Sequence, residues 1–181
     1  MGFKAMILEV KSVSKHFGGI TALSNISMAV AKGEIVGLIG PNGAGKTTFF
    51  NCITGVYRPD AGKIIFGEYA EDITRFPAHR VSERGIARTF QNARVFASMS
   101  ALENVMVGTF SRTSAKMWAA IRRSPGMIDE EHAVRRRCEE LLRFVKLGNR
   151  AADLASSLPF GLQRRLEIAR ALATEPRLLL M

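Results

Sequence analysis

The stretch Gly40-Pro41-Asn42-Gly43-Ala44-Gly45-Lys46-Thr47-Thr48 decides the fold of this chain, because it matches G-x-x-x-x-G-K-[ST] at every defined position. An apolar run at 34–39 precedes it and is suited to a buried parallel strand. Residues 47–54 follow without Gly or Pro and predict a helix. An accidental Gly-rich turn would fill the four fixed positions in fewer than about one in a hundred chains of this length. The stretch therefore predicts a phosphate-binding loop.

The residue types of this loop explain the chemistry that we expect from it. Its three glycines let backbone N–H groups approach an anion closely at a helix N-terminus. Lys46 adds a positive charge that reaches the β- and γ-oxygens of a nucleotide, and the Thr47 hydroxyl is suited to ligate Mg²⁺. Thr48 is placed for the α-phosphate. We expect all nine residues of the stretch to line a nucleotide site.

The composition is that of a globular protein, with 47% hydrophobic and 23% charged residues over 181 positions. No apolar run reaches the roughly eighteen residues of a membrane span, and a secretory signal is absent, so the cytoplasm is the expected compartment. Cys52 and Cys138 lie far apart in predicted helices, without metal-binding spacing, and are expected to be reduced core thiols. The histidines His16, His79 and His132 match no motif and are expected at the surface.

A formal net charge of +10 would ordinarily suggest nucleic acid or an anionic membrane as a partner. However, the basic residues are not interleaved with aromatics, and several alternate with Glu on helical faces. Arg135 and Glu139, for example, have the i,i+4 spacing of a helical ion pair. We therefore expect no nucleic-acid partner.

The remaining pattern predicts alternating strands and helices in one domain with soft internal boundaries. The β-rich and P-loop part extends over 1–98, a helical part over 99–156, and a return to the core over 157–181. Strands are expected at 7–13, 23–30, 63–67, 86–91 and 178–181, and helices from 77, from 101, at 128–146 and at 162–173.

Three further stretches carry a family resemblance. Arg88-Thr89-Phe90-Gln91 follows the loop as the glutamine switch loop does in ATP-binding cassette (ABC) proteins, and residues 158–172 are similar to their signature loop and helix. Phe17 matches their aromatic residue upstream of the phosphate loop. These stretches cover nearly the whole chain in the family's order, whereas the guanine-specific N-K-x-D motif is absent. The resemblance implies an α/β P-loop NTPase core of the ABC ATPase type, with an N-terminal β subdomain and a helical insertion, incomplete at the C-terminus.

The resemblance also implies roles for residues outside the loop. Phe17 would stack on adenine, and Gln91 would reach Mg²⁺ and the attacking water. In this family two ATPase domains sandwich two nucleotides head to tail, so a group of four signature residues would contact the partner's nucleotide: Phe160, Gly161, Leu162 and Gln163. Lys46 and Gln91 would serve catalysis, and ATP with Mg²⁺ would be bound.

Within the family, the chain most resembles the larger ATP-binding subunit of bacterial branched-chain amino acid importers. That likeness implies a subunit at the cytoplasmic face of the inner membrane, which couples ATP hydrolysis to import through transmembrane permease subunits and works indirectly with a periplasmic amino acid binding protein. Two alternatives stay open: an ATPase of another ABC class (export or soluble factor), and a non-catalytic nucleotide-binding fragment. Copurification with a permease, or binding without turnover, separates these possibilities.

The sequence departs from the family pattern in two places. Pro159 stands where the signature normally carries Ser, so a hydroxyl and an N–H are lost. We expect weakened γ-phosphate recognition, with donors remaining at Gly161 and Leu162. Residues 178–181 resemble the strand that leads into Asp-Glu-Pro, which does not follow. The acidic residues for Mg²⁺ and water are therefore expected to be missing, and this chain alone is expected to hydrolyse ATP hardly at all.

Overall fold

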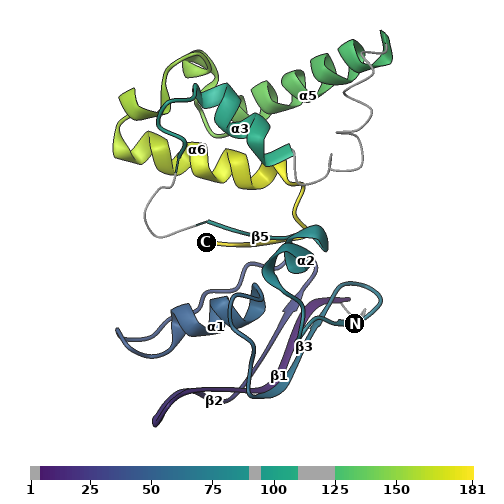
Figure 1. Ribbon diagram of the computed structural model, residues 1–181, viewed down its shortest axis with the longest axis vertical. Coiled ribbons are helices and arrows are strands. Elements are labelled where there is room, and N and C mark those ends of the chain that lie inside the picture. Colours follow the sequence, from purple (N-terminus) through teal and green to yellow (C-terminus); the bar gives the residue numbers. More distant parts are fainter. Residues whose placement is uncertain (1–4, 90–94, 110–124) are drawn as a thin grey trace. The chain divides into compact units, whose positions relative to one another are not determined.

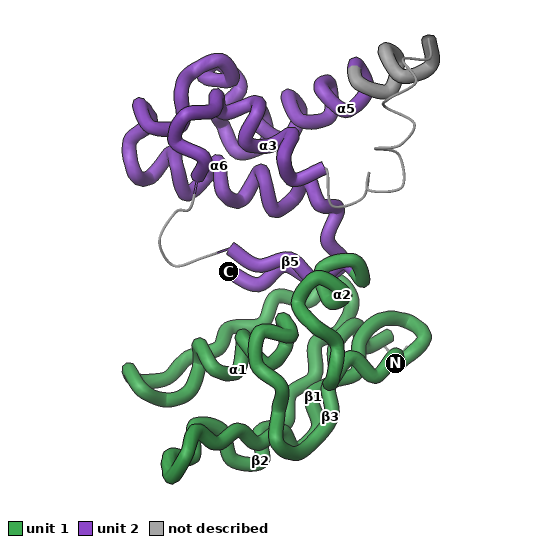
Figure 2. The backbone as a smooth tube through the Cα atoms, in the orientation of Figure 1, with its two compact units in different colours: residues 1–84 green, residues 85–181 purple. Residues whose placement is uncertain are grey.

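A computed structural model describes residues 5–89, 95–109 and 125–181, with the backbone alone for 125–131. The chain divides into two compact units, Met1–Arg84 and Gly85–Met181 (Figure 2). Each unit builds its own hydrophobic core.

Unit 1 is an antiparallel sheet with two helices. Its elements, in chain order, are β1 (Met6–Phe17), β2 (Ile20–Ala31), α1 (Lys46–Ile53), β3 (Ala61–Phe66), β4 (Glu71–Asp72) and α2 (Ala78–Glu83) (Figure 1). The strand order is β2-β1-β3-β4. Strands predicted at 7–13, 23–30 and 63–67 are confirmed, as is the helix that Pro77 opens. The first two strands are longer than predicted because their antiparallel pairing continues through several register shifts.

Alternating apolar side chains place one face of this sheet in the core. Leu8 and Val10 of β1 are fully or almost fully buried, as are Ile64 and Phe66 of β3, with which β1 pairs. A residue spacing of two sends these side chains to the same face. The central strand β1 therefore fixes the position of its far end, where Phe17 pairs with Ile20 across the hairpin turn.

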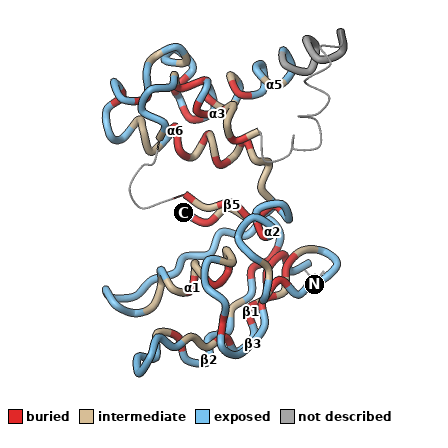
Figure 3. The backbone as a smooth tube through the Cα atoms, in the orientation of Figure 1, coloured by how far each residue is buried: buried red, intermediate tan, exposed pale blue. Residues whose placement is uncertain are grey.

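The helix that follows the phosphate loop is confirmed, but the strand predicted before the loop is wrong. Residues 34–39, which follow β2, have no strand partner among the described residues and belong to the exposed class (Figure 3). Ile35 and Ile39 are 99% and 93% exposed. Glu34 instead closes a turn, since its carboxylate accepts the N–H of Ala31 at 2.8 Å. Apolar composition favours a strand only where a neighbouring strand supplies hydrogen bonds, and no described strand does so here.

Unit 2 is a helical cluster joined to a short parallel ladder. Its elements are β5 (Ile86–Arg88), α3 (Ala101–Thr109), α5 (Pro125–Phe144), two 3-10 turns (Gly148–Arg150 and Ala155–Ser157), α6 (Phe160–Ala173) and β6 (Leu178–Leu180). Among its core residues, Val105 of α3, Leu142 of α5 and Leu166 of α6 are completely buried. The helical faces predicted at 128–146 and 162–173 are confirmed by this packing.

Strands β5 and β6 pair in parallel, with Ile86 opposite Leu178 and Arg88 opposite Leu180. The Thr89 N–H continues the ladder to the Leu180 carbonyl at 2.9 Å. A parallel pair linked through helices is the arrangement expected of an α/β core. This confirms the strand predicted at 178–181 and places the first residues of the predicted switch stretch at the end of β5.

Candidate nucleotide site

The phosphate loop presents a set of unpaired backbone donors at the start of α1. Gly45 is the N-cap residue, in the left-handed region with φ of +83°, and no side chain caps the helix. In the described part of the chain, the N–H groups of 45–48 donate to no protein acceptor, whereas the next one, of Phe49, bonds to the Gly45 carbonyl at 2.8 Å. Unpaired N–H groups and the positive end of the helix dipole together favour an anion at this position.

Gly45 is required sterically as well as conformationally. A Cβ atom at this position would lie 2.4 Å from the Ala22 carbonyl oxygen and 2.9 Å from a methyl carbon of Leu23. The register between β1 and β2 explains this approach: Lys15 pairs with Leu23 and His16 with Thr21, so Ala22 is an extra, bulged residue. Bulges redirect the backbone locally, and this one places the Ala22 carbonyl against the loop.

The side chain of Lys46 folds back over the loop. Its Nζ donates to the carbonyl oxygens of Gly40 at 2.6 Å and Pro41 at 2.7 Å. These contacts hold the ammonium group beside the unpaired N–H groups at the start of α1. A phosphate bound there would meet a positive charge that is already in place.

Thr47 lies in the first turn of α1 with an exposed side chain. A hydroxyl oxygen suits Mg²⁺, which prefers oxygen ligands and usually keeps several waters and substrate phosphates as its other ligands. Among the described residues, no group of three or more His, Cys, Asp or Glu side chains could hold a metal ion. Among the described residues of the loop and α1, the Thr47 hydroxyl is the ligand that the sequence predicts for this ion.

Phe17 lies within nucleoside reach of the loop. It is 42% exposed and pairs with Ile20, two residues before the bulged Ala22 that contacts the loop. At about 3.3 Å per residue along a strand and about 4.8 Å between strands, the Cα atoms of Phe17 and Ala22 lie roughly 8 Å apart. Because the Ala22 carbonyl lies against Gly45 of the loop, the exposed Phe17 ring is suitably placed for a base whose phosphates occupy the loop.

Three residues around Phe17 were missed by the sequence reasoning. The Tyr57 ring packs edge-on against Phe17, with centroids 5.2 Å apart and planes at 73°. The Lys15 Nζ lies over the Phe17 ring, 5.4 Å from its centroid, and forms an ion pair with Asp60 at 2.9 Å. The sequence around Asp60 indicates only a turn, because its partners lie more than forty positions away.

The signature stretch begins α6, as predicted, with Pro159 as its N-cap residue. The prediction that the Leu162 N–H stays available is wrong: it donates to the Pro159 carbonyl at 2.8 Å, because the first turn of the helix is tight. The Gln163 N–H bonds to the same carbonyl at 3.0 Å, and its side-chain amide donates to the Leu158 carbonyl. The donors left at this helix start belong to Phe160, which is 64% exposed, and to the residue after it.

That residue, Gly161, has open space around it. A Cβ atom added to Gly161 would meet nothing within 4 Å, so neither packing nor a positive φ explains a glycine there. The backbone at the start of α6 is therefore not covered by other atoms of unit 2 at this position.

The comparison with protein families decides which class of nucleotide-binding protein this geometry represents. The family model described as ABC transporter matches residues 23–181. The chain belongs to the ABC transporter family. The α/β P-loop fold and the ATPase assignment predicted from the sequence are thereby confirmed.

Curated relatives in this ABC family include two transport proteins. The chain is 39% identical over 175 residues to the high-affinity branched-chain amino acid transport ATP-binding protein BraF of Pseudomonas aeruginosa, and 37% identical to the corresponding protein LivG of Salmonella typhimurium. In both comparisons the match covers 97% of this chain and 68% of the relative. The chain thus spans about two thirds of the length of these relatives.

Solved structures of ABC cassettes agree with the fold. A nucleotide-free ATP-binding cassette is 33% identical, with a TM-score of 0.78, and a cassette in its ADP conformation is 33% identical, with a TM-score of 0.80. Each comparison covers 96% of this chain and 67% of the other. Both structures therefore share the cassette fold of this chain.

The ABC switch glutamine expected at Gln91 lies outside the described residues, as does Phe90. Further along the chain, Phe96 is held by the fully buried Asn104 of α3. Its side-chain oxygen accepts the Phe96 N–H at 2.8 Å, and its amide donates to the Phe96 carbonyl at 3.0 Å. Arg170 of α6 stacks on the Phe96 ring at 5.2 Å from its centroid, and burial lowers the pKa of this guanidinium.

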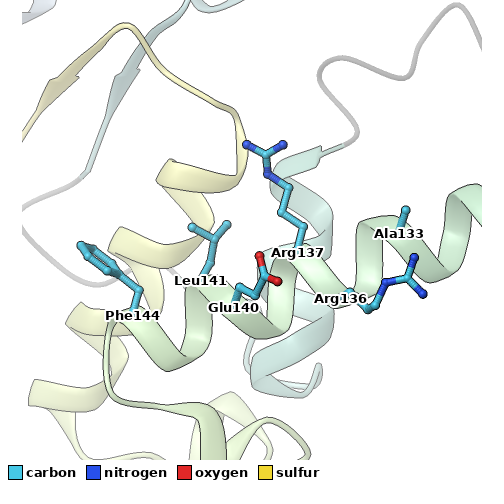
Figure 4. Close-up of a pocket in the computed structure, with 6 residues that line it drawn as sticks. All are labelled: Ala133, Arg136, Arg137, Glu140, Leu141 and Phe144. Atoms are coloured by element: carbon cyan, nitrogen blue, oxygen red, sulfur yellow. The ribbon is translucent and has the colours of Figure 1, made fainter.

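Other surface features of this ABC chain carry no predicted site residue. A hollow of about 600 Å³ on α5 is lined by Ala133, Arg136, Arg137, Glu140, Leu141 and Phe144 (Figure 4). The three histidines are exposed, and Cys52 and Cys138 are buried and unbonded, as predicted; burial raises the pKa of both thiols. None of the described helices is both long and apolar enough to cross a membrane.

Proposed function

We propose that this chain is the ATP-binding subunit of a branched-chain amino acid importer, docked peripherally on membrane permease subunits at the cytoplasmic face. The nucleotide part of this proposal is supported by the phosphate loop, in which four consecutive unpaired N–H groups and Lys46 converge at the start of α1. The transport part is supported by the resemblance to BraF and LivG.

Each residue predicted to bind the nucleotide then has a defined task. The N–H groups of 45–48 hold the β-phosphate, and Lys46 exchanges its carbonyl partners for β- and γ-oxygens. Thr47 supplies one hydroxyl ligand to a Mg²⁺ ion that the phosphates also bind, and this ion neutralises charge on the transferring group. Thr48 lies beside the α-phosphate, while Phe17 stacks on the adenine. Gln91 orients the attacking water and contacts the metal.

The signature stretch acts on a second subunit's nucleotide. In a head-to-tail dimer the exposed start of α6 would donate the N–H groups of Phe160 and Gly161 to the γ-phosphate bound by the partner. Leu162 and Gln163 shape this helix start, because their N–H groups bond to Pro159. A periplasmic binding protein would deliver the amino acid to the permease.

The nucleotide part is tested by equilibrium binding of ATP to wild type and Lys46→Ala. Because a hydrogen bond to a charged group contributes about 1.5–3 kcal/mol, the substitution should raise the Kd at least about tenfold. Lys32→Ala is the matched control: it removes an exposed lysine of the same unit, paired with Glu68, and should leave the Kd unchanged. Equal Kd values for Lys46→Ala and wild type would contradict the assignment of this loop.

The transport part needs a separate experiment, because identity alone does not separate substrates. The sulfate/thiosulfate import ATP-binding protein CysA of Pseudomonas aeruginosa is still 35% identical to this chain, although the match covers only 49% of that protein. The complete transporter should be reconstituted in vesicles with its permease, and ATP-driven uptake of leucine measured against that of sulfate. Leucine uptake is expected; sulfate uptake alone would refute the proposed substrate class.

A further inference from the structure

The Phe17 ring is held in place by two neighbouring side chains. Phe17 ends β1, where the hairpin turn alone would leave an aromatic side chain free to change rotamer. The Lys15 ammonium lies over the ring, while the Tyr57 ring packs against it at 73°. Phe17 nevertheless keeps 42% of its surface exposed. The ring therefore has two supporting neighbours and still leaves part of its surface exposed.

Lys15 is itself fixed in place. Its side chain is only 15% exposed, although lysine side chains ordinarily extend into water. The ammonium group donates to Asp60 Oδ1 at 2.9 Å. Two residues further along β1, this ammonium contacts the Phe17 ring, so the carboxylate of Asp60 determines where the positive charge lies.

Asp60 joins two segments that are remote in the sequence. Its second oxygen, Oδ2, accepts the backbone N–H of His16 at 2.6 Å, and its own N–H donates to the Ser14 carbonyl at 2.9 Å. Both contacts attach the turn after α1 to the end of β1. The same turn region carries Tyr57, whose N–H bonds to the Asn51 carbonyl of α1. The helix that holds phosphate and the strand end that carries Phe17 are thereby linked directly.

We propose that Asp60 and Lys15 are positioning residues for the adenine of ATP: Asp60 fixes Lys15 over the Phe17 ring, Tyr57 supports the ring, and the exposed part of the ring receives the base. The inference rests on the proposed stacking role of Phe17. A platform held in one orientation before binding loses less conformational entropy when the base arrives.

The test compares ATP with inorganic triphosphate, which fills the loop but has no base. Asp60→Asn keeps an oxygen for the His16 N–H and removes the charge that holds Lys15. It should raise the Kd for ATP about threefold to tenfold and leave the Kd for triphosphate unchanged. Lys15→Met should act alike, whereas Lys15→Arg restores a cation and should return the ATP Kd most of the way to wild type.

Controls separate this inference from the proposed function. Asp72→Asn removes another hydrogen-bonded carboxylate of unit 1, remote in sequence from Phe17, and should change neither Kd. Phe17→Ala should raise the Kd for ATP and leave the Kd for triphosphate unchanged. If it does so while Asp60→Asn and Lys15→Met bind ATP like wild type, the positioning role is refuted and the stacking role stands. If Phe17→Ala leaves ATP binding unchanged, the stacking role fails and the inference with it. If Asp60→Asn raises the Kd for ATP and the Kd for triphosphate by the same factor, the role of Asp60 is merely structural and the inference is overturned.

Discussion

At the level of single residues, two glycines of the phosphate loop are required for different reasons. Gly43 is needed only for its backbone conformation, whereas Gly45 is needed for its conformation and for the lack of a side chain. Both have positive φ, of +82° and +83°, but a Cβ atom meets nothing within 4 Å at Gly43 and overlaps the Ala22 carbonyl at Gly45. Gly43→Ala should therefore cost about 1 kcal/mol of unfolding free energy, and Gly45→Ala about 3 kcal/mol or more. Urea denaturation followed by circular dichroism measures both; equal losses would argue against the close approach.

Residue-level prediction worked where a motif is local and failed where a contact spans the fold. The spacing of the loop glycines and Lys46 was readable because all of these residues act within nine positions. The partnership of Asp60 with Lys15 was not, since it joins residues 45 positions apart. Pro159 was correctly placed before a helix start, yet the sequence could not show that the Leu162 N–H is taken by the Pro159 carbonyl.

At the scale of elements, the contact between α3 and α6 depends on Gly108. A Cβ atom there would lie 2.4 Å from the Arg170 carbonyl oxygen and 3.0 Å from the Ala173 Cβ. Gly108→Ala should force the helices apart and lower the unfolding free energy by about 2–3 kcal/mol, despite the better helix propensity of Ala. Gly161→Ala, in open space on α6, should be neutral or up to about 1 kcal/mol stabilising. Thermal unfolding of both variants tests this; a stabilised Gly108→Ala would contradict it.

The helices could be predicted from their own sequences, whereas an apolar run forms a strand only where another strand lies beside it. The apolar face of α6 repeats at helical spacing and was confirmed by its buried residues. The run at 34–39 is equally apolar, but a strand exists only through hydrogen bonds to another strand, and no described segment supplies them. The strand at 178–181 formed because β5 lies beside it.

At the scale of the whole molecule, stability should fall in acid. Carboxylates in both units have pKa values held below their ordinary values by hydrogen bonds: Asp60 by Lys15, Glu71 by Arg84, Asp72 by Thr74 and Glu103 by the Ser100 N–H. Because the unfolded chain then binds more protons, these contributions are complete above the unfolded pKa values and are lost as the pH falls below about 4. The Tm should stay level from pH 7 to about 5 and then drop. A Tm that rises between pH 5 and 3 would contradict this.

The fold class was predictable as a whole because four motifs occur in one order over nearly the entire chain. Motif order reports which family a chain belongs to, and here the family model confirmed it. It does not report where the chain separates into compact units, since that depends on which segments pack together. The break at Arg84 follows from such packing, and no composition change marks it.

Because Ala22 is a bulged residue, the β1–β2 hairpin should not tolerate a change of length at this position. Successive residues of a strand face opposite sides. Removing Ala22 would therefore remove the bulge and change the direction in which the neighbouring residues at the end of the hairpin face. The carbonyl that meets Gly45 would then point elsewhere, and the support under the phosphate loop would be lost. A label or linker is better inserted beyond Phe17, at the Gly18–Gly19 turn, where added Cβ atoms meet nothing. This hairpin therefore tolerates an insertion at its tip, but not a deletion at Ala22, three residues after Gly19.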